Sequence, residues 1–209
     1  MTYTANLKYD VRDDRILFID VEMTCWSGAP PEGQRSEVIE IGVAELDLDT
    51  LEVVRSQSYL VQPVFSRISE YCTELTGIAV DDVRRRGRPL KEVASRLQKD
   101  FGTRSKQWLS WGPDRRALER DFAEKGIPFC FSAAFVDMGL EFKHSLGQSR
   151  SIGLTRAMQL YGLERTGRIH SGEGDAIDTA LLWAEMARRR RAELLHLLQD
   201  DAASTPVNP

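Results

Sequence analysis

The 209-residue chain carries near its start a short apolar run that ends in two acids, Ile16-Leu17-Phe18-Ile19-Asp20-Val21-Glu22. An apolar run of this length predicts a buried β-strand. Successive side chains of a strand point to opposite faces, so Asp20 and Glu22 share one face and lie close together. Two carboxylates held together at the end of a buried strand repel each other unless a cation lies between them. The alternative is that these acids merely end a strand at the surface, and the run alone does not decide between the two.

The rest of the chain predicts a hairpin followed by alternating helices and strands. Residues 38–48 and 51–62 favour β-structure on either side of a two-residue turn. Further expected elements are helices over 89–101, 113–125, 152–161 and 173–191 and strands over 108–111 and 129–136. This order predicts one domain over residues 15–195, of the α/β or the α+β class, with helices packed on a sheet. Residues 1–14 are expected to be a lead-in and residues 196–209 a disordered tail.

Composition narrows the class of protein. No run of about eighteen apolar residues occurs, so no membrane span is expected, and residues 1–15 are too polar for a secretory signal. The three cysteines are unclustered, which favours reduced thiols and a cytoplasmic location. The net charge of −4 gives the protein no overall electrostatic attraction for nucleic acid. An enzyme that holds a few nucleotides through metal ions does not need a net positive charge. The arginine clusters at 84–88 and 188–191 are either solvated helix ends or phosphate contacts.

Two later segments place chemically useful side chains at helix starts. Ser110-Trp111-Gly112-Pro113-Asp114 ends a strand, turns and opens a helix, so Asp114 lies in a first helical turn. His170 lies five residues before Asp175, at the start of the last helix and in a glycine-flanked loop. An imidazole there could take a proton from a metal-bound water, because its ordinary pKa lies near neutral pH. A simpler explanation exists for each residue. The acid Asp114 could be favoured at a helix start by the helix dipole alone, and His170 could be a loop residue without a role.

Taken in order, these segments resemble the DEDDh 3′-to-5′ exonucleases of the ribonuclease H-like superfamily, in the form of the ERI-1-like exoribonuclease branch. The resemblance runs from about residue 15 to about residue 190, and three positions depart from it. Ile169 stands where the branch often has a second histidine, Gly174 where it usually has an acid, and Met23 where a smaller residue is common. The segments that carry the resemblance are residues 20–32, 37–42, 71–78, 110–114 and 170–180.

The resemblance implies a ribonuclease H-like fold, a mixed five-stranded sheet flanked by helices, and a metal-dependent active site. The five implied catalytic residues are Asp20, Glu22, Asp114, His170 and Asp175. Two Mg²⁺ or Mn²⁺ ions would be bound, one by Asp20, Glu22 and Asp175, the other by Asp20 and, through water, by Asp114. His170 would be the general base.

The resemblance also implies that the substrate is the 3′ end of single-stranded RNA or DNA, with RNA favoured. The implied product is a nucleoside 5′-monophosphate. Residues 75–77 would line the pocket for the terminal base, and Trp26 would offer a stacking surface. The expected substrate-binding residues are Met23, Thr24, Trp26, Leu75, Thr76, Gly77 and Trp111.

Two other functions compete with this one. A sugar hydrolase also needs two carboxylates, but neither a metal nor the histidine, so activity that survives a chelator would favour it. A binding module that keeps the fold would have no need for all five residues. The sequence leaves the oligomeric state open.

Overall fold

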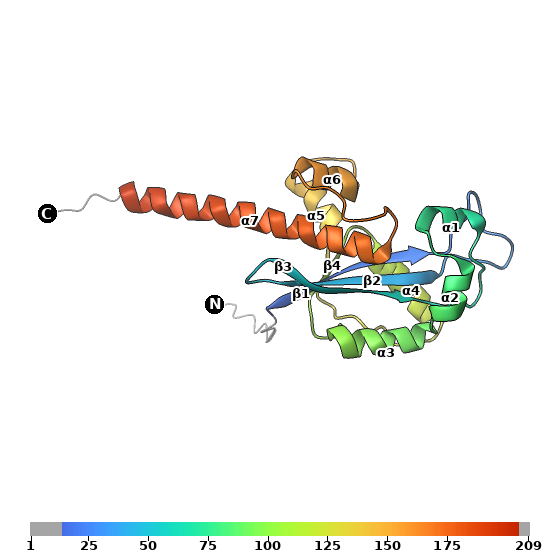
Figure 1. Ribbon diagram of the computed structural model, residues 1–209. Coiled ribbons are helices and arrows are strands. Elements are labelled where there is room, and N and C mark those ends of the chain that lie inside the picture. Colours follow the sequence, from blue (N-terminus) through green and yellow to red (C-terminus); the bar gives the residue numbers. More distant parts are fainter. Residues whose placement is uncertain (1–13, 205–209) are drawn as a thin grey trace, which may run out of the picture.

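The computed structural model describes residues 14–204, with side chains up to Leu198. Its centre is one five-stranded sheet in the order β3-β2-β1-β4-β5 (Figure 1). The first three strands form an antiparallel meander, and the other two run parallel to β1. The predicted mixed sheet is therefore confirmed. The strands are β1 (Arg15–Met23), β2 (Val38–Asp47), β3 (Glu52–Leu60), β4 (Trp108–Ser110) and β5 (Phe135–Asp137).

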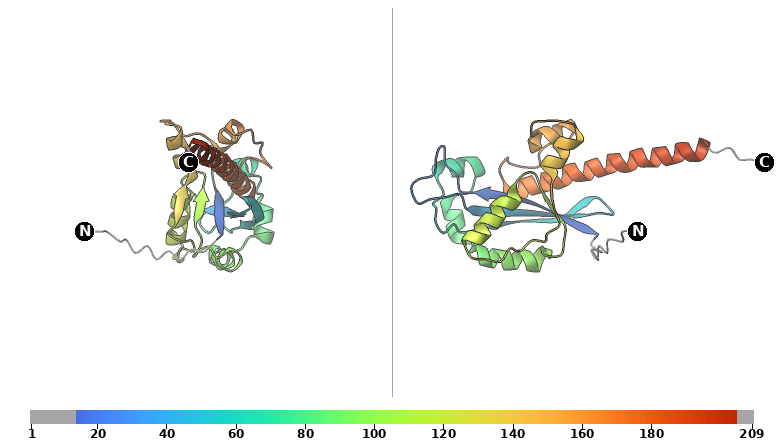
Figure 2. Two further views of the ribbon diagram at one scale, coloured as in Figure 1. Left: turned by 90° about the vertical axis from the view of Figure 1, so that its left-hand side faces the viewer. Right: turned by 180° about the vertical axis from the view of Figure 1, so that it is seen from behind.

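Helices cover both faces of this sheet, which explains why the apolar run in β1 is continuous rather than alternating (Figure 2). Leu17 and Ile19 point into a core built with α3 and α4, while Ile16 and Phe18 point into a second core built with α5, α6 and α7. The helices are α1 (Glu70–Thr76), α2 (Val80–Arg86), α3 (Leu90–Phe101), α4 (Asp114–Glu124), α5 (Met138–Ser145), α6 (Leu154–Leu160) and α7 (Gly172–Ser204). None of the helices in the described range has both the length and the apolar content needed to cross a bilayer.

Several predicted elements are confirmed near their expected bounds: the hairpin, the strand at 108 and the helices at 89, 113 and 152. The strand predicted over 129–136 is wrong, because only Phe135–Asp137 pair with a neighbour. Phe129 and Phe131 are apolar for another reason, since their rings pack on Trp108 with centroids 6.4 and 4.8 Å away.

The end of the chain also differs from expectation. Helix α7 does not stop at Arg191 but continues to Ser204, so the tail predicted to be disordered from residue 196 is helical that far. Residues 192–204 contain no glycine or proline and are rich in alanine and leucine, which favour helix. Residues 1–13 and 205–209, the rest of the predicted lead-in and tail, lie outside the described residues.

Candidate active site

Three parts of the chain bring the five predicted residues to one edge of the sheet. Asp20 and Glu22 lie at the C-terminal end of β1. Because β4 runs parallel to β1, the helix that follows it starts at the same edge and presents Asp114, its first residue. Helix α7 packs across β1 and β2 and carries Asp175 in its first turn. Ligand atoms of Glu22, Asp175 and His170 all lie within 4.8 Å of one another.

The carboxylates of this edge are buried, as Glu22 and Asp175 are, or half-buried, as Asp20 and Asp114 are, and they repel one another. Burial, followed by the negative charges of Asp114, Asp175 and Glu22, raises the pKa of Asp20 well above its ordinary value. Burial and the charges of Asp175 and Glu40 raise the pKa of Glu22 to about 8. For Asp114, burial outweighs its hydrogen bonds and raises the pKa to about 6. The protein thus holds more negative charge here than its own cations neutralise.

Arg165 supplies part of the missing positive charge. Its half-buried guanidinium forms an ion pair with Asp175, and its Nε lies 2.8 Å from Oδ2 of Asp178. Asp178 is fully buried and accepts a hydrogen bond from the backbone N–H of Thr166 at 2.9 Å. The pKa of Asp175 is still raised, because burial exceeds the effect of Arg165. Arg165 therefore fixes the loop before α7 without cancelling the charge of the site.

Arg168 connects the same loop to α1. Its guanidinium donates hydrogen bonds to the backbone carbonyls of Glu74 and Leu75, the latter at 3.3 Å. Gly77, which ends α1 with φ of 77°, leaves room for this side chain, since a Cβ there would lie 2.1 Å from Nη1 of Arg168. The segment with the general-base candidate is thereby tied to the predicted base pocket.

His170 itself has an exposed side chain and a left-handed backbone, with φ of 60°. A non-glycine residue keeps this conformation only when its surroundings impose it. Here the next residues are fixed: the N–H of Gly172 donates to Glu40 at 3.0 Å, and the N–H of Asp175 donates to the carbonyl of Ser171 at 2.7 Å. A Cβ on Gly42 would lie 1.9 Å from the Gly172 backbone, so only glycine lets α7 start this close to β2.

The predicted substrate-binding residues are distributed over several surfaces. Thr76 and Gly77 line a recess of about 330 Å³ together with Glu40 and Ser171, next to the acids. Trp26 lines a separate recess, with Ser69 and Tyr71 among its walls. Leu75 and Met23 are half-buried.

Two of the predicted contacts are occupied within the protein. The hydroxyl of Thr24 is fully buried, donates to the carbonyl of Arg35 at 3.1 Å and accepts from the N–H of Glu37 at 2.9 Å. The indole N–H of Trp111 donates to the carbonyl of Ile152 at 3.1 Å. The side-chain polar groups of Thr24 and Trp111 therefore stabilise loops rather than face the open site.

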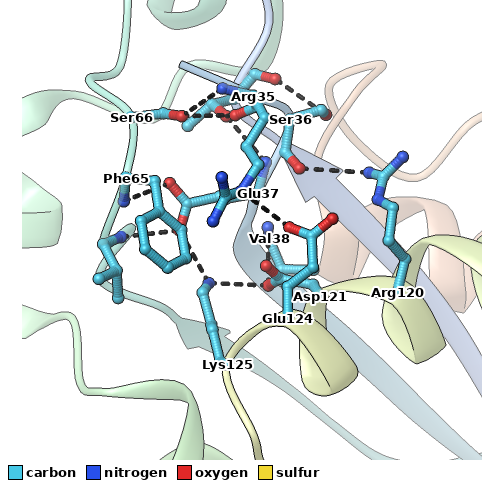
Figure 3. A network of polar contacts seen from close by, with 12 residues as sticks. Arg35, Ser36, Glu37, Val38, Phe65, Ser66, Arg120, Asp121, Glu124 and Lys125 are labelled. Carbon is cyan, nitrogen blue, oxygen red and sulfur yellow. Dashed lines mark hydrogen bonds and ion pairs between the residues drawn. The ribbon is translucent and has the colours of Figure 1, made fainter. Parts of the chain in front are cut away.

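The loop between β1 and β2, which carries Trp26, is held by a buried polar network (Figure 3). The carboxylate of Glu37 accepts hydrogen bonds from the N–H groups of Val64 and Phe65, at 2.7 and 2.8 Å. Lys125, which directly follows α4, forms ion pairs with Glu37 at 3.0 Å and with Asp121 at 2.9 Å. One lysine thus joins α4, this loop and the segment after β3.

Sequence reasoning assigned no role to two further acids of the site. Glu40 lies opposite Glu22 in the β1–β2 register, is 6% exposed and accepts a hydrogen bond from Ser58 at 2.5 Å. Its signal was an acid within the apolar first half of β2, Val38-Ile39-Glu40-Ile41. Asp137 ends β5, caps α5 by accepting from the N–H of Leu140 at 2.9 Å, and raises the pKa of Asp114. Only the strand order reveals that Asp137 is near the site.

The donor set fits divalent cations. Carboxylates whose pKa values are raised, two of which, Glu22 and Asp175, bring oxygen atoms within 4.8 Å of each other, are ligands that Mg²⁺ and Mn²⁺ bind. The sequence pattern of the Exonuclease (RNase T) family matches residues 17–182, and the chain belongs to this family.

Individual relatives narrow the class. The chain is 31% identical over 191 residues to human 3′-5′ exoribonuclease 1, covering 83% of this chain and 52% of that protein. It is 28% identical over 219 residues to the 3′-5′ exonuclease Snipper of Drosophila melanogaster, and the match covers 93% of this chain and 76% of that protein. The solved nuclease domain of 3′hExo, a DEDDh family member bound to rAMP, superposes with a TM-score of 0.71 at 27% identity. The superposition covers 86% of this chain and 94% of that domain. The chain spans about half the length of the human exoribonuclease.

The protein is therefore a metal-dependent 3′-to-5′ exonuclease of the DEDDh type, in the ERI-1-like branch.

Proposed function

We propose that this exonuclease releases nucleoside 5′-monophosphates from the 3′ end of single-stranded nucleic acid, with RNA preferred to DNA, and that it acts in the cytoplasm. The observation that carries the proposal is the cluster of buried carboxylates with raised pKa values beside an exposed histidine. The preference for RNA is supported by the relatives, one named an exoribonuclease and another bound to rAMP. The three cysteines that the structure leaves free agree with a reducing compartment.

In this proposal, Asp20, Glu22 and Asp175 hold one Mg²⁺ or Mn²⁺ ion, and Asp20, with Asp114 through water, holds a second. When bound, such ions neutralise the phosphate and lower the pKa of a coordinated water. The protein contributes rigidity: β1 fixes two of the ligands, and Arg165 and the start of α7 fix the third.

His170 takes the proton from the attacking water as the water oxygen bonds to the terminal phosphorus and the 3′-oxygen of the preceding nucleotide leaves. Its exposed side chain next to buried acids supports this role. Because it also lies within ligand distance of Glu22 and Asp175, it could instead bind metal. These two roles predict different behaviour when the imidazole is removed.

The terminal base would lie against Leu75, Thr76 and Gly77 at the end of α1, with Met23 and Trp26 on the approach. Contacts of Arg168 with the carbonyls at the end of α1 support a link between this pocket and the His170 loop. The backbones of Thr24 and Trp111 would shape the walls.

The test is a product ladder. Single-stranded RNA and DNA of one sequence, each labelled at the 5′ end, are incubated with Mg²⁺ or Mn²⁺. A ladder that shortens one nucleotide at a time, faster for RNA, is expected. Equal rates on DNA would remove the RNA preference.

Two substrates test the polarity. A strand ending in a 3′-phosphate should resist, because a pocket for a terminal 3′-hydroxyl leaves no room for the added group, and a circular strand should stay intact. Rapid cutting of the circle would identify an endonuclease instead. Activity that persists in excess EDTA would favour the two-carboxylate sugar hydrolase.

A further inference from the structure

The segment from residue 167 to residue 170, which carries the general-base candidate, is held in place by few contacts. Before it, the N–H and the hydroxyl of Thr166 donate to a carboxylate of α7 at 2.9 and 2.8 Å, and after it the N–H of Gly172 donates to a carboxylate of β2 at 3.0 Å. Among the described residues, Arg168 is the only member of the segment with a hydrogen bond to another element. The place of His170 relative to the rest of the site therefore depends on Arg168.

The partner of Arg168 is the end of α1, which lies near the start of α7 (Figures 1 and 2). The guanidinium donates hydrogen bonds to the carbonyls of Glu74 and Leu75. Carbonyls in the last turn of a helix have no intrahelical donor, so an arginine is a suitable partner for them. The glycine at position 77 makes this approach possible, because a Cβ there would occupy the space of the guanidinium.

The end of α1 is a rigid anchor. The hydroxyl of Thr76, which is 4% exposed, donates to the carbonyl of Cys72 at 2.8 Å and accepts from the N–H of Ile78 at 3.1 Å. The hydroxyl of Thr73 donates to the carbonyl of Ile78 at 3.0 Å. Residues 75–77 of this same turn form the proposed base pocket. Arg168 thus attaches the His170 segment to a fixed wall of that pocket.

The fold does not need Arg168 in the way that it needs Arg165. The side chain of Arg165 is 12% exposed and forms ion pairs with Asp175 and Asp178, which already secure the start of α7. Arg168 is exposed, and within the described range of the chain it forms no ion pair with a carboxylate. Its hydrogen bonds go to the two carbonyls beside the base pocket. A role in placing groups for the reaction explains these contacts better than a role in stability.

We propose that Arg168 is a positioning residue, which holds His170 at a fixed place relative to the base pocket so that a terminal base in the pocket brings the scissile phosphate to the imidazole. The inference rests on the proposed function, in which His170 is the general base. Arg168 acts through His170 and does not itself touch the reacting atoms. Because a displacement of about 1 Å can lower a rate roughly 10²-fold, the terminal base should contribute to turnover as well as to binding.

The first test separates kcat from KM on single-stranded RNA labelled at the 5′ end. Arg168→Ala should lower kcat roughly 10- to 100-fold and leave KM nearly unchanged, because the pocket stays in place. Arg168→Lys should recover little, since an ammonium lacks the planar fork that reaches two carbonyls. Arg156→Ala is the control for loss of charge, because Arg156 is exposed on α6 and hydrogen-bonds to Gln159 of its own helix, and it should behave like the unmodified chain.

Three results of this test would overturn the proposal. An unchanged kcat in Arg168→Ala would leave the arginine without a role in the reaction. A rise in KM alone would make it a contact for the substrate phosphates. Full recovery by Arg168→Lys would show that charge, and not the tie to α1, is what matters. Circular dichroism and the metal-induced increase in melting temperature should be unchanged in each variant, which shows that the fold and the acids are intact.

The second test removes the terminal base instead of the arginine. RNA that ends in an abasic ribose is compared with RNA that ends in adenosine, in single turnovers at saturating enzyme. For the unmodified chain the abasic end should lower the rate about tenfold, whereas for Arg168→Ala the two substrates should differ by less than about twofold. The same loss in both proteins would refute the coupling. If the unmodified chain shortens neither RNA, the proposed function itself fails, whereas normal shortening with equal losses removes this inference alone.

Discussion

Two buried carboxylates at opposite ends of the β1–β2 pair differ in how the protein treats their charge. Glu45, fully buried on β2, forms ion pairs with Lys106 and with Arg55, the latter at 2.6 Å. Burial acts to raise the pKa of Glu45, but the hydrogen bonds from Arg55 and Lys106 outweigh it and the pKa is lowered. Glu22, 7% exposed on β1, has a pKa raised to about 8, and no lysine or arginine in the described part of the chain forms an ion pair with it.

This difference separates a structural acid from a functional one. The cations around Glu45 are part of the fold, and they keep the acid ionised without help. Around Glu22 the fold adds further acids, and Arg168 offsets them only in part. A buried carboxylate whose charge the fold leaves uncompensated favours an external cation, which is the property of a metal site. The network of Glu37 and Lys125 is of the first kind, since its hydrogen bonds outweigh burial and lower the pKa of Glu37.

The largest effect is expected from removing the imidazole, because it separates proton transfer from metal binding. His170→Ala should lower the turnover rate roughly 10²–10⁴-fold, as the loss of a general base usually does. The Mg²⁺-induced increase in melting temperature should remain, because the acids stay in place. Single-turnover rates and thermal shifts measure the two properties.

Asp175→Ala is the contrasting variant for His170→Ala, and it should lose both the rate and the shift. Loss of the metal-induced shift in His170→Ala would make the histidine a ligand. An unchanged rate would leave it without a role.

The next prediction concerns the free energy of unfolding, which should change in opposite directions when Glu45 and Glu22, at opposite ends of the β1–β2 pair, are neutralised. Glu45→Gln should lower the free energy of unfolding by roughly 3 kcal/mol, near the lower limit for breaking a buried pair, because half-exposed Arg55 can turn to solvent. Glu22→Gln should stabilise the metal-free protein slightly, because it removes a repelled charge, while it abolishes activity. Urea unfolding in EDTA measures both. Equal destabilisation by the two changes would show that the charge around Glu22 is compensated after all.

A slightly smaller effect is expected from the metal itself. Mn²⁺ or Mg²⁺ should stabilise the folded protein by about 2.7 kcal/mol at one hundred times the dissociation constant. Asp20→Asn should lose most of this gain, whereas the exposed control Asp81→Asn on α2 should keep it. Thermal unfolding across a metal titration provides the measurement. An unmodified chain that shows no shift in millimolar Mn²⁺ would rule out the site.

Much of this arrangement could be predicted from local patterns. The apolar run before Asp20, the hairpin and the strand-turn-helix around Asp114 each lie in a few consecutive residues. The convergence of Asp114 with Asp20 depends on the parallel pairing of β1 and β4, which no local pattern shows. Its prediction came from the order of segments resembling one family.

Other parts could not be predicted, for physical reasons. Helices α1, α2 and α5 have seven or eight residues, so each shows barely two turns of a helical period. The equally short α6 was predicted only as part of a longer segment, residues 152–161. The roles of Arg165 and Arg168 depend on contacts with residues on other elements, and an arginine in a loop has no distinguishing signal. Glu40 was visible as an acid in the apolar first half of β2, but only the register places it opposite Glu22.

The smallest expected effect is the pH dependence of stability in the metal-free protein, which tests the difference between Glu22 and Glu45. The pKa of Glu22 is raised from 4.5 to about 8, so between these values the folded metal-free protein binds more protons than the unfolded chain. Its stability should therefore fall as pH rises through this window, and the raised pKa values of Asp20 and Asp175 act in the same direction. For a chain of this size, each 1 kcal/mol corresponds to roughly 2–4 °C in Tm, so a fall of several degrees is expected in EDTA.

Metal should reverse this fall, because cations replace the protons, and the apparent metal affinity should rise with pH over the same range. Two variants assign the effect to one end of the sheet. Glu22→Gln should flatten the decline, whereas Glu45→Gln should lower Tm at every pH and leave the slope unchanged, because the pKa of Glu45 is lowered and its titration lies below the window. If Tm in EDTA is constant or rises from about pH 5.5 to about pH 8, the folded protein does not bind the extra protons and the acids of the site are not repelled as described. If Glu45→Gln flattens the slope as much as Glu22→Gln, the two carboxylates do not differ in the way their surroundings indicate.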